Sequence, residues 1–261
     1  MKLKTLLLAL LASPLAAQVP DMTGSTVAMG HLHVLVDEAN FDSHRKAWIE
    51  GLGARAVKPL GALLIPGTTV VIKKGKSAGG SEGTSVNHLG FLVRDLDAAV
   101  DRWTGHGYEV FPERPSDHQA FLRFPGNIKV ELSEDPLLIT PIAHHHIHLF
   151  TTDVMGVQAW YLKHFGGTAG ERGRFKEVWY PGVRISIAEA ESKPVGSKGR
   201  GIDHIGFEVD GLEAFCKKLE GMGVQFDIPY KEIPAINLSV AFLTDPWGTY
   251  IELTEGLDKI K

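Results

Sequence analysis

The stretch His31-Leu-His-Val-Leu-Val-Asp37 returns three more times along the chain, as HLGFLVRD at 88–95, HIHLFTTD at 146–153 and HIGFEVD at 204–210. The leading histidines, at positions 31, 88, 146 and 204, are therefore 57 or 58 residues apart. Repetition at a fixed period indicates one supersecondary unit that was copied. Each copy also carries an ionisable side chain at the same point, so the repeat bears on chemistry as well as on fold.

Every copy predicts the same order of elements. The His-led run has the apolar content of a half-buried strand. The apolar residues that follow recur at helical spacing, as in the fourth copy at Leu212, Phe215, Cys216, Leu219 and Met222. Glycines such as Gly221 and Gly223 come next, and glycine suits a helix end because the terminating residue often takes a positive φ. Three strand-like segments complete the unit, so the sequence predicts an α+β fold of four βαβββ modules.

The four modules fall into two classes. Modules one and three carry His-x-His, at His31 and His33 and at His146 and His148, whereas modules two and four carry His-x-Gly. This AB-AB order indicates that a half of two modules was doubled. The Pro-containing segment 135–141 separates the halves. We therefore predict an N-terminal half at 29–135 and a C-terminal half at 142–256.

Two glutamates complete a pattern typical of a metal site. Glu131 and Glu252 lie in the last predicted strands of modules two and four, so each half holds two first-strand histidines and one glutamate. Two neutral imidazoles and a carboxylate bind divalent Fe, Mn, Zn or Ni and leave coordination positions open for substrate. The sequence predicts a metal site in the C-terminal half, formed by His146, His204 and Glu252. A second, weaker site is predicted in the N-terminal half, formed by His31, His88 and Glu131.

Two further histidines share a strand face with these residues. Alternation along a strand puts His148 on the face of His146, and His33 on the face of His31. A histidine there can support a metal ligand or move a proton near neutral pH. It can equally be a packed histidine, and the residues leave this open. Of the two, His148 is our candidate for the catalytic acid or base.

Composition and the first residues bear on partners and location. The net charge of −4 gives no electrostatic reason to expect nucleic acid. Lys2 and Lys4 precede a short apolar run, and Ala16-Ala17 supplies small residues, a layout that predicts a signal peptide at 1–17. We therefore expect a secreted or periplasmic protein without stable membrane insertion after cleavage of the signal. Cys216 is the only cysteine, so no internal disulfide is possible.

The His-led first strands, the βαβββ unit and the final segment DPWGTYIEL at 245–253 resemble the vicinal oxygen chelate superfamily. That superfamily includes glyoxalase I, bleomycin resistance proteins and type I extradiol dioxygenases. The resemblance implies that modules pair into two open β-barrels, each around a metal. Glyoxalase I-like members use two glutamates per site, but here Val71 or Ile72 and Ser186 or Ile187 stand at the matching places. The single glutamate per site is closer to extradiol dioxygenases, although Phe242 stands where those enzymes carry a tyrosine.

From the site residues we expect an exported metalloenzyme that acts on a small oxygenated molecule, by dioxygenase, lyase or isomerase chemistry. The metal would bind two neighbouring substrate oxygens and stabilise the charge that develops on them. A non-catalytic protein of the same fold, which holds a small molecule or a metal without turnover, is the alternative. Fold alone does not decide between them.

Overall fold

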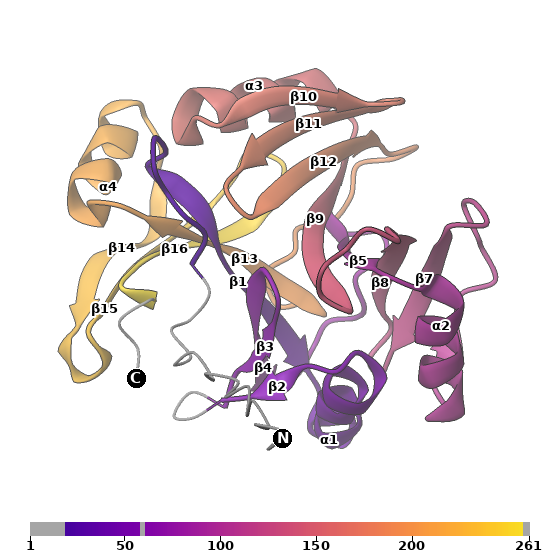
Figure 1. The fold of residues 1–261 in the computed structure, drawn as a ribbon. Helices are drawn as coiled ribbons and strands as arrows, with labels where there is room; N and C mark the ends of the chain where they lie inside the picture. The colour runs from indigo at the N-terminus through magenta and orange to yellow at the C-terminus, as the bar shows by residue number, and fades with distance from the viewer. Residues whose placement is uncertain (1–18, 58–60, 258–261) are drawn as a thin grey trace, which may run out of the picture.

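A computed structural model of the protein describes residues 19–57 and 61–257. The predicted signal peptide at 1–17 lies outside these residues. The described chain forms two mixed sheets of eight strands each, with helices packed against them, which confirms the α+β class (Figure 1). No helix in this part of the chain has the length and apolar character needed to cross a membrane.

The first two modules follow the predicted order, strand, helix, three strands. Module one consists of β1 (Val27–Val36), α1 (Glu38–Lys46) with a π-helical turn (Ala47–Gly51), β2 (Arg55–Ala56), β3 (Leu63–Ile65) and β4 (Thr68–Lys74). Module two consists of β5 (Val86–Val93), α2 (Leu96–Gly105), β6 (Glu109–Val110), β7 (Gln119–Phe124) and β8 (Ile128–Glu134).

The last two modules repeat this order. Module three consists of β9 (Ile142–Thr151), α3 (Val154–Phe165), β10 (Thr168–Arg172), β11 (Phe175–Tyr180) and β12 (Val183–Glu189). Module four consists of β13 (Ile202–Val209), α4 (Leu212–Gly221), β14 (Phe226–Ile233), a 3₁₀ turn (Pro234–Ile236), β15 (Leu238–Thr244) and β16 (Tyr250–Glu255). The His-led run lies in the first strand of every module.

The aspartates that close the His-led runs have a local role in two modules. Asp95 precedes α2 and accepts a hydrogen bond from the backbone N–H of Ala98. Asp153 precedes α3 and accepts one from Gly156. A carboxylate at this position satisfies an N–H group that has no partner within the helix. These residues therefore fix where the strand ends and the helix begins.

Each sheet joins one module from each half of the chain. The strand orders are β14-β15-β16-β13-β1-β4-β3-β2 and β10-β11-β12-β9-β5-β8-β7-β6. Module one thus pairs with module four through β1 and β13, and module two pairs with module three through β5 and β9. The halves 29–135 and 142–256 would have placed modules one and two in one sheet, and three and four in the other, so the sheets do not follow the halves.

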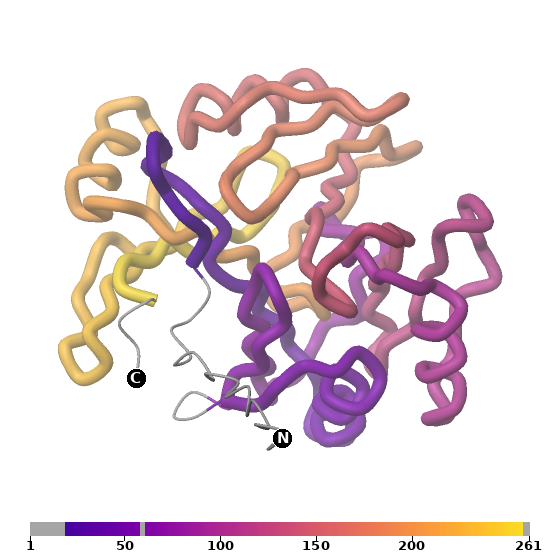
Figure 2. Tube along the Cα trace, viewed as in Figure 1, coloured from indigo at the N-terminus to yellow at the C-terminus, as the bar shows by residue number. Residues whose placement is uncertain are grey.

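The linkers permit this arrangement. Segment 135–141 connects two modules of the same sheet and is held by a hydrogen bond from Arg94 N–H to the Pro141 carbonyl. Segments 75–85 and 190–201 each pass from one sheet to the other. They run side by side, because Ser85 N–H donates to the Val195 carbonyl and Gly201 N–H donates to that of Gly79. The two crossings therefore stabilise each other between the sheets (Figure 2).

Cutting segment 135–141 should leave the protein assembled, because two sheets hold the halves together. Leu137 and Ile139 are 89% and 92% exposed, so a protease site inserted between them would be accessible. We expect the two fragments to elute together in size-exclusion chromatography under native conditions and to separate only in denaturant. Separation into two folded halves without denaturant would contradict the strand pairing.

Candidate metal centres

The pairing of first strands brings the two repeat classes face to face. In one sheet His31 of β1 lies opposite Gly206 of β13, and His33 lies opposite His204. In the other sheet His146 of β9 lies opposite Gly90 of β5, and His148 opposite His88. Each antiparallel pair therefore gathers three histidines on one short piece of sheet.

The glutamates join from the neighbouring parallel strands. Glu252 of β16 pairs with Gly206, and Glu131 of β8 pairs with Gly90. Two clusters result, in each of which the ligand atoms lie within 4.8 Å of one another. We call them site I and site II; they consist of His31, His33, His204 and Glu252, and of His88, Glu131, His146 and His148.

The glycine of His-x-Gly makes room for a histidine on the opposite strand. A Cβ atom on Gly90 would lie 2.0 Å from Cε1 of His146, and one on Gly206 would lie 2.3 Å from Cε1 of His31. Any larger residue would displace the imidazole ring. Each glycine of modules two and four thus lies opposite the first histidine of the paired module, three or one, and leaves space for its ring.

In site I two imidazoles converge on one carboxylate oxygen. The Nε2 atoms of His31 and His204 each lie 2.9 Å from Oε2 of Glu252. Nδ1 of His33 lies 2.7 Å from Nε2 of His204. On the other side of the His204 ring, Nδ1 lies 2.6 Å from a carboxylate oxygen of Asp203, which orients the ring.

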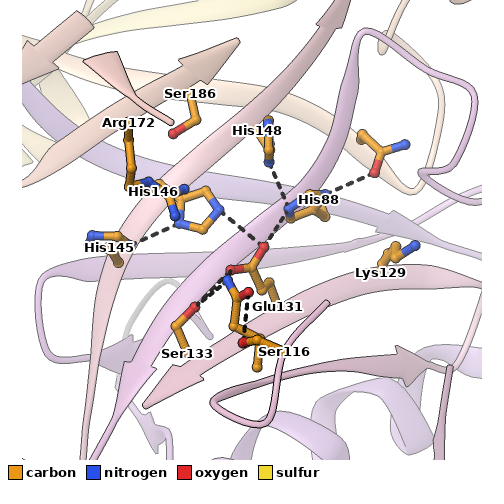
Figure 3. A network of polar contacts seen from close by, with 12 residues as sticks. His88, Ser116, Lys129, Glu131, Ser133, His145, His146, His148, Arg172 and Ser186 are labelled. Atoms are coloured by element: carbon orange, nitrogen blue, oxygen red, sulfur yellow. Dashed lines mark hydrogen bonds and ion pairs between the residues drawn. The ribbon is translucent and has the colours of Figure 1, made fainter. Parts of the chain in front are cut away.

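Site II has the same plan (Figure 3). Nε2 of His88 lies 3.1 Å from Oε2 of Glu131, and Nε2 of His146 lies 3.7 Å from it. Nδ1 of His148 lies 3.0 Å from Nε2 of His88. The second oxygen of Glu131 accepts hydrogen bonds from Gln119 Nε2 at 2.8 Å and Ser133 Oγ at 2.7 Å, so this carboxylate is held with Oε2 toward the histidines.

The charge states suit metal ligands. Burial alone would raise the pKa of Glu131 and Glu252, but the surrounding histidines outweigh it and hold both pKa values well below the usual range. Burial, with the nearby His88 and His146, holds the pKa of His148 well below its usual range. The pKa of His88 is lowered by burial, which the attraction of Glu131 only partly offsets. At neutral pH His88 and His148 are therefore neutral and lie beside an ionised carboxylate.

Site I differs in one respect. Burial lowers the pKa of His33 to about 3, helped by the adjacent His204 and His31. For His204 burial acts in the same direction, but hydrogen bonding to Asp203 and Glu252 prevails and raises the pKa. Two carboxylates thus surround His204, whereas the matching His88 has the amide oxygen of Asn87 at 2.9 Å from its Nδ1.

The geometry fits a divalent cation. Ligand atoms bonded to one ion at about 2.0–2.2 Å and at right angles lie roughly 3 Å apart, and the contacts in both sites range from 2.7 to 3.7 Å. Nε2 of His146 is buried and has no hydrogen-bond partner. An unpaired buried nitrogen is costly, and a cation at the centre of the cluster would satisfy it. His146, His88 and Glu131 could hold such an ion in site II, and His31, His204 and Glu252 could hold one in site I.

The structure groups the predicted residues differently from the sequence. His146 does not meet His204 and Glu252; it meets His88 and Glu131. His31 in turn joins His204 and Glu252. Every site still contains two first-strand histidines and one last-strand glutamate. The grouping by halves was wrong because β1 pairs with β13 and β5 with β9, so each site takes residues from both halves.

The register also resolves the place of a second glutamate. Val71 pairs with His33, and Ser186 pairs with His148, as the glutamates pair with the glycines of the other modules. Val71 and Ser186, rather than their neighbours, therefore match Glu131 and Glu252. Ser186 Oγ donates a hydrogen bond at 2.8 Å to Glu177, a fully buried carboxylate on β11.

Several supporting residues were missed at the level of sequence. Asp203 and Asn87 each precede the histidine that they contact, so comparison of the aligned repeats would have found them. Ser133 follows Glu131 by two residues and so lies on the same strand face, whereas Gln119 is brought to Glu131 only by the pairing of β7 with β8.

Site II borders a large cavity. The cavity has a volume of about 960 Å³, and His88, Glu131 and His148 form part of its wall. Phe121, Phe150 and Phe175 add an aromatic surface beside these ligands. The ring of Phe175 stands edge-on to His148, with 4.7 Å between centroids. A small molecule in this cavity would therefore reach the cluster directly.

Comparison with known proteins agrees with this architecture. Residues 143–253, which cover modules three and four, match the model of the Glyoxalase/Bleomycin resistance protein/Dioxygenase superfamily. Modules three and four therefore resemble this superfamily in sequence. No curated protein matches the chain.

Solved members of the superfamily extend the likeness to all four modules. Glyoxalase I from Zea mays is 14% identical, with a TM-score of 0.72 over 91% of this chain and 95% of that one. A candidate dioxygenase from Bacillus subtilis subsp. subtilis strain 168 is 15% identical, with a TM-score of 0.67 over 88% of this chain and 86% of that one. At these identities the likeness is one of fold.

Metal titration of single and double variants will test the grouping. We expect His204→Ala to remove one zinc ion per chain and His146→Ala to remove the other, since the two residues lie in different sites. The double variant should bind none, whereas adding Glu252→Ala to His204→Ala should cause no further loss. If His146→Ala and His204→Ala remove the same single ion, the grouping shown by the fold is contradicted.

Gly90→Ala should disrupt site II without unfolding the protein. The new methyl group would occupy the place of the His146 ring, so zinc affinity at site II should fall roughly tenfold or more. Gly105→Ala is the matched control, because its Cβ would meet no atom within 4 Å. Competition titration with a chelating dye measures the affinity, and circular dichroism checks the fold. Unchanged affinity in Gly90→Ala would show that this glycine does not position His146.

Proposed function

We propose that this protein is a metal-dependent enzyme of the vicinal oxygen chelate superfamily and that site II is its reacting centre. The observation that carries the proposal is the cavity of about 960 Å³ whose wall includes His88, Glu131 and His148. A catalytic metal site needs coordination positions that substrate can reach. We further propose that the chain is exported by means of the segment 1–17.

Five residues of site II and its surroundings would together hold a cation. His88, His146 and Glu131 would supply two imidazoles and one carboxylate, and Gln119 and Ser133 would keep the carboxylate from turning away. A divalent cation held there supplies Lewis acidity, which favours binding of two neighbouring substrate oxygens and stabilises negative charge on them. A small oxygenated organic molecule is therefore the proposed substrate.

The aromatic wall would position the carbon skeleton of that substrate. Phe121 packs edge-on against His88 with 5.3 Å between ring centroids, and Phe150 packs against His148 with 5.2 Å. These rings border the ligands on the cavity side, so an apolar or planar part of a substrate would displace water from them on binding.

We assign His148 the movement of a proton. It is neutral at neutral pH, because burial lowers its pKa, and it lies against the ligands without being needed for the two-histidine, one-carboxylate set. Its Nε2, which has no hydrogen-bond partner, would take up the proton of a substrate hydroxyl as the oxygen binds. The proton could return to the product from the same atom.

The choice between oxygenation and lyase or isomerase chemistry depends on the metal. Ser186 stands where a second glutamate would act, so site II has one ionised carboxylate among its ligands. Turnover that survives exchange among Mn, Zn and Ni would favour lyase or isomerase chemistry. Strict dependence on Fe(II) and molecular oxygen would favour dioxygenase chemistry.

The test combines metal content with turnover. Protein stripped with chelator and reloaded with each metal is assayed on a panel of vicinal diols, hydroxyketones and catechols, by oxygen uptake and by product analysis. We expect His148→Gln to retain its metal while kcat falls about 100-fold or more. His118→Gln is the control, because that side chain is 75% exposed and lies outside both sites.

Two results would overturn the proposal. Equal turnover in wild type and in His146→Ala would remove site II from the reaction. Saturable binding of the panel without any product, under every metal, would instead identify a binding protein that uses the same cavity.

A further inference from the structure

Beside the ligands of site II, the cavity wall contains an arginine whose position is fixed by a buried carboxylate. Arg172 ends β10, and its side chain is 36% exposed. Its Nε donates a hydrogen bond at 3.2 Å to Oε1 of Glu177, whose side chain is completely buried. Arg172 lines the same cavity as His148, and its charge contributes to lowering the pKa of His148.

Glu177 is itself held from three sides. Besides Arg172, it accepts hydrogen bonds from Trp179 Nε1 at 2.7 Å and from Ser186 Oγ at 2.8 Å. Burial would raise the pKa of Glu177, but these three donors outweigh it and lower the pKa. The carboxylate therefore stays ionised and anchors Arg172 through one nitrogen.

The other two nitrogens of Arg172 make no hydrogen bond to any residue that the structure describes. A guanidinium group presents five N–H donors in a rigid plane, and fixing one edge leaves the remainder oriented. In Figure 3 Arg172 and Lys129 flank the cluster of His88, Glu131 and His146. The guanidinium group of Arg172 is therefore preorganised to bind an anion.

Neighbouring charges agree with an anionic ligand at this end of the cavity. Arg174 follows in the turn between β10 and β11, lines the cavity and has no ion-pair partner among the described residues; its guanidinium lies 5.2 Å from the centroid of Phe175. Lys129 and Lys176 are already paired, with Glu82 and Glu171. Carboxylates also line the cavity, at Glu113, Glu189 and Glu191, but none of the three forms an ion pair with Arg172 or Arg174 within the described chain.

We propose that the substrate of site II carries a carboxylate or similar oxyanion beside its two chelating oxygens, and that Arg172 binds this group. The inference rests on the proposed function, since the chelating oxygens are those that site II would bind. Arg172 is then the residue that selects acids over neutral analogues, and Arg174 attracts them to the cavity mouth. Charge-assisted hydrogen bonds from arginine to a carboxylate are among the strong interactions of protein binding sites.

The test uses two probes that share one chelating unit. Catechol and 3,4-dihydroxybenzoate present the same pair of oxygens and differ by one carboxylate. The protein is loaded with zinc for this experiment, because zinc has no redox chemistry and neither probe is then consumed. Isothermal titration calorimetry gives both dissociation constants, and their ratio is the preference for the acid. We expect wild type to bind the acid about tenfold more tightly than catechol, with a smaller ratio at high salt.

Variants separate the role of Arg172 from a structural one. Arg172→Gln should abolish the preference while leaving the affinity for catechol unchanged. Because that change leaves Glu177 buried without its cation, Arg172→Gln combined with Glu177→Gln is tested as well, and it should give the same result. Arg184→Gln is the control: Arg184 stacks on Trp179 at 5.3 Å from its centroid, does not line the cavity, and should keep the preference.

The outcomes distinguish the two proposals. Equal binding of both probes by wild type, or a preference that persists in both Arg172 variants, would overturn the role of Arg172 and leave the proposed function intact. Binding of neither probe by zinc-loaded wild type, when site II is shown to be filled, would overturn the proposed function and this inference together.

Discussion

The rest of the structure depends on one antiparallel contact, the pairing of a His-x-His strand with a His-x-Gly strand. β1 meets β13 in this way, and β9 meets β5. The register places histidine opposite histidine and histidine opposite glycine, and the glycine is required because a Cβ there would overlap the facing ring. Sheet continuity, the depth of each cluster and the approach of the glutamates all follow from this register.

The two sites share a plan but differ in what surrounds them. In site I the ring of His204 lies between two carboxylates, Asp203 and Glu252, which favours tight retention of a cation. In site II the matching residue of Asp203 is the neutral Asn87, and the ligands border a large cavity. Local substitutions thus change the surroundings of each cluster while the types of candidate ligand stay the same.

In site II a buried carboxylate lies close to the position that lacks a second glutamate. Ser186 stands where a second glutamate would reach the metal, and the nearby carboxylate Glu177 lies one strand away, turned toward Ser186, Trp179 and Arg172. Its negative charge therefore fixes an arginine at the cavity wall and does not enter the ligand set. The proposed selection of an acidic substrate rests on this contact between Glu177 and Arg172.

The sequence by itself determined the module, its fourfold repeat and the types of residue that form each site, because strand alternation and a fixed period specify which side chains share a face. Asp203 and Asn87, which precede equivalent histidines, were missed, although aligning the repeats would have indicated them. The sequence could not determine which modules pair: His-x-His of module one is complementary to His-x-Gly of module two and of module four alike. Only the tertiary structure decided this, since the linkers 75–85 and 190–201 cross between sheets together while 135–141 turns back within one. The same is true of Gln119, Arg172 and Glu177, whose contacts depend on the strand register within the β7–β8 and β10–β11 hairpins and have no counterpart in the repeat.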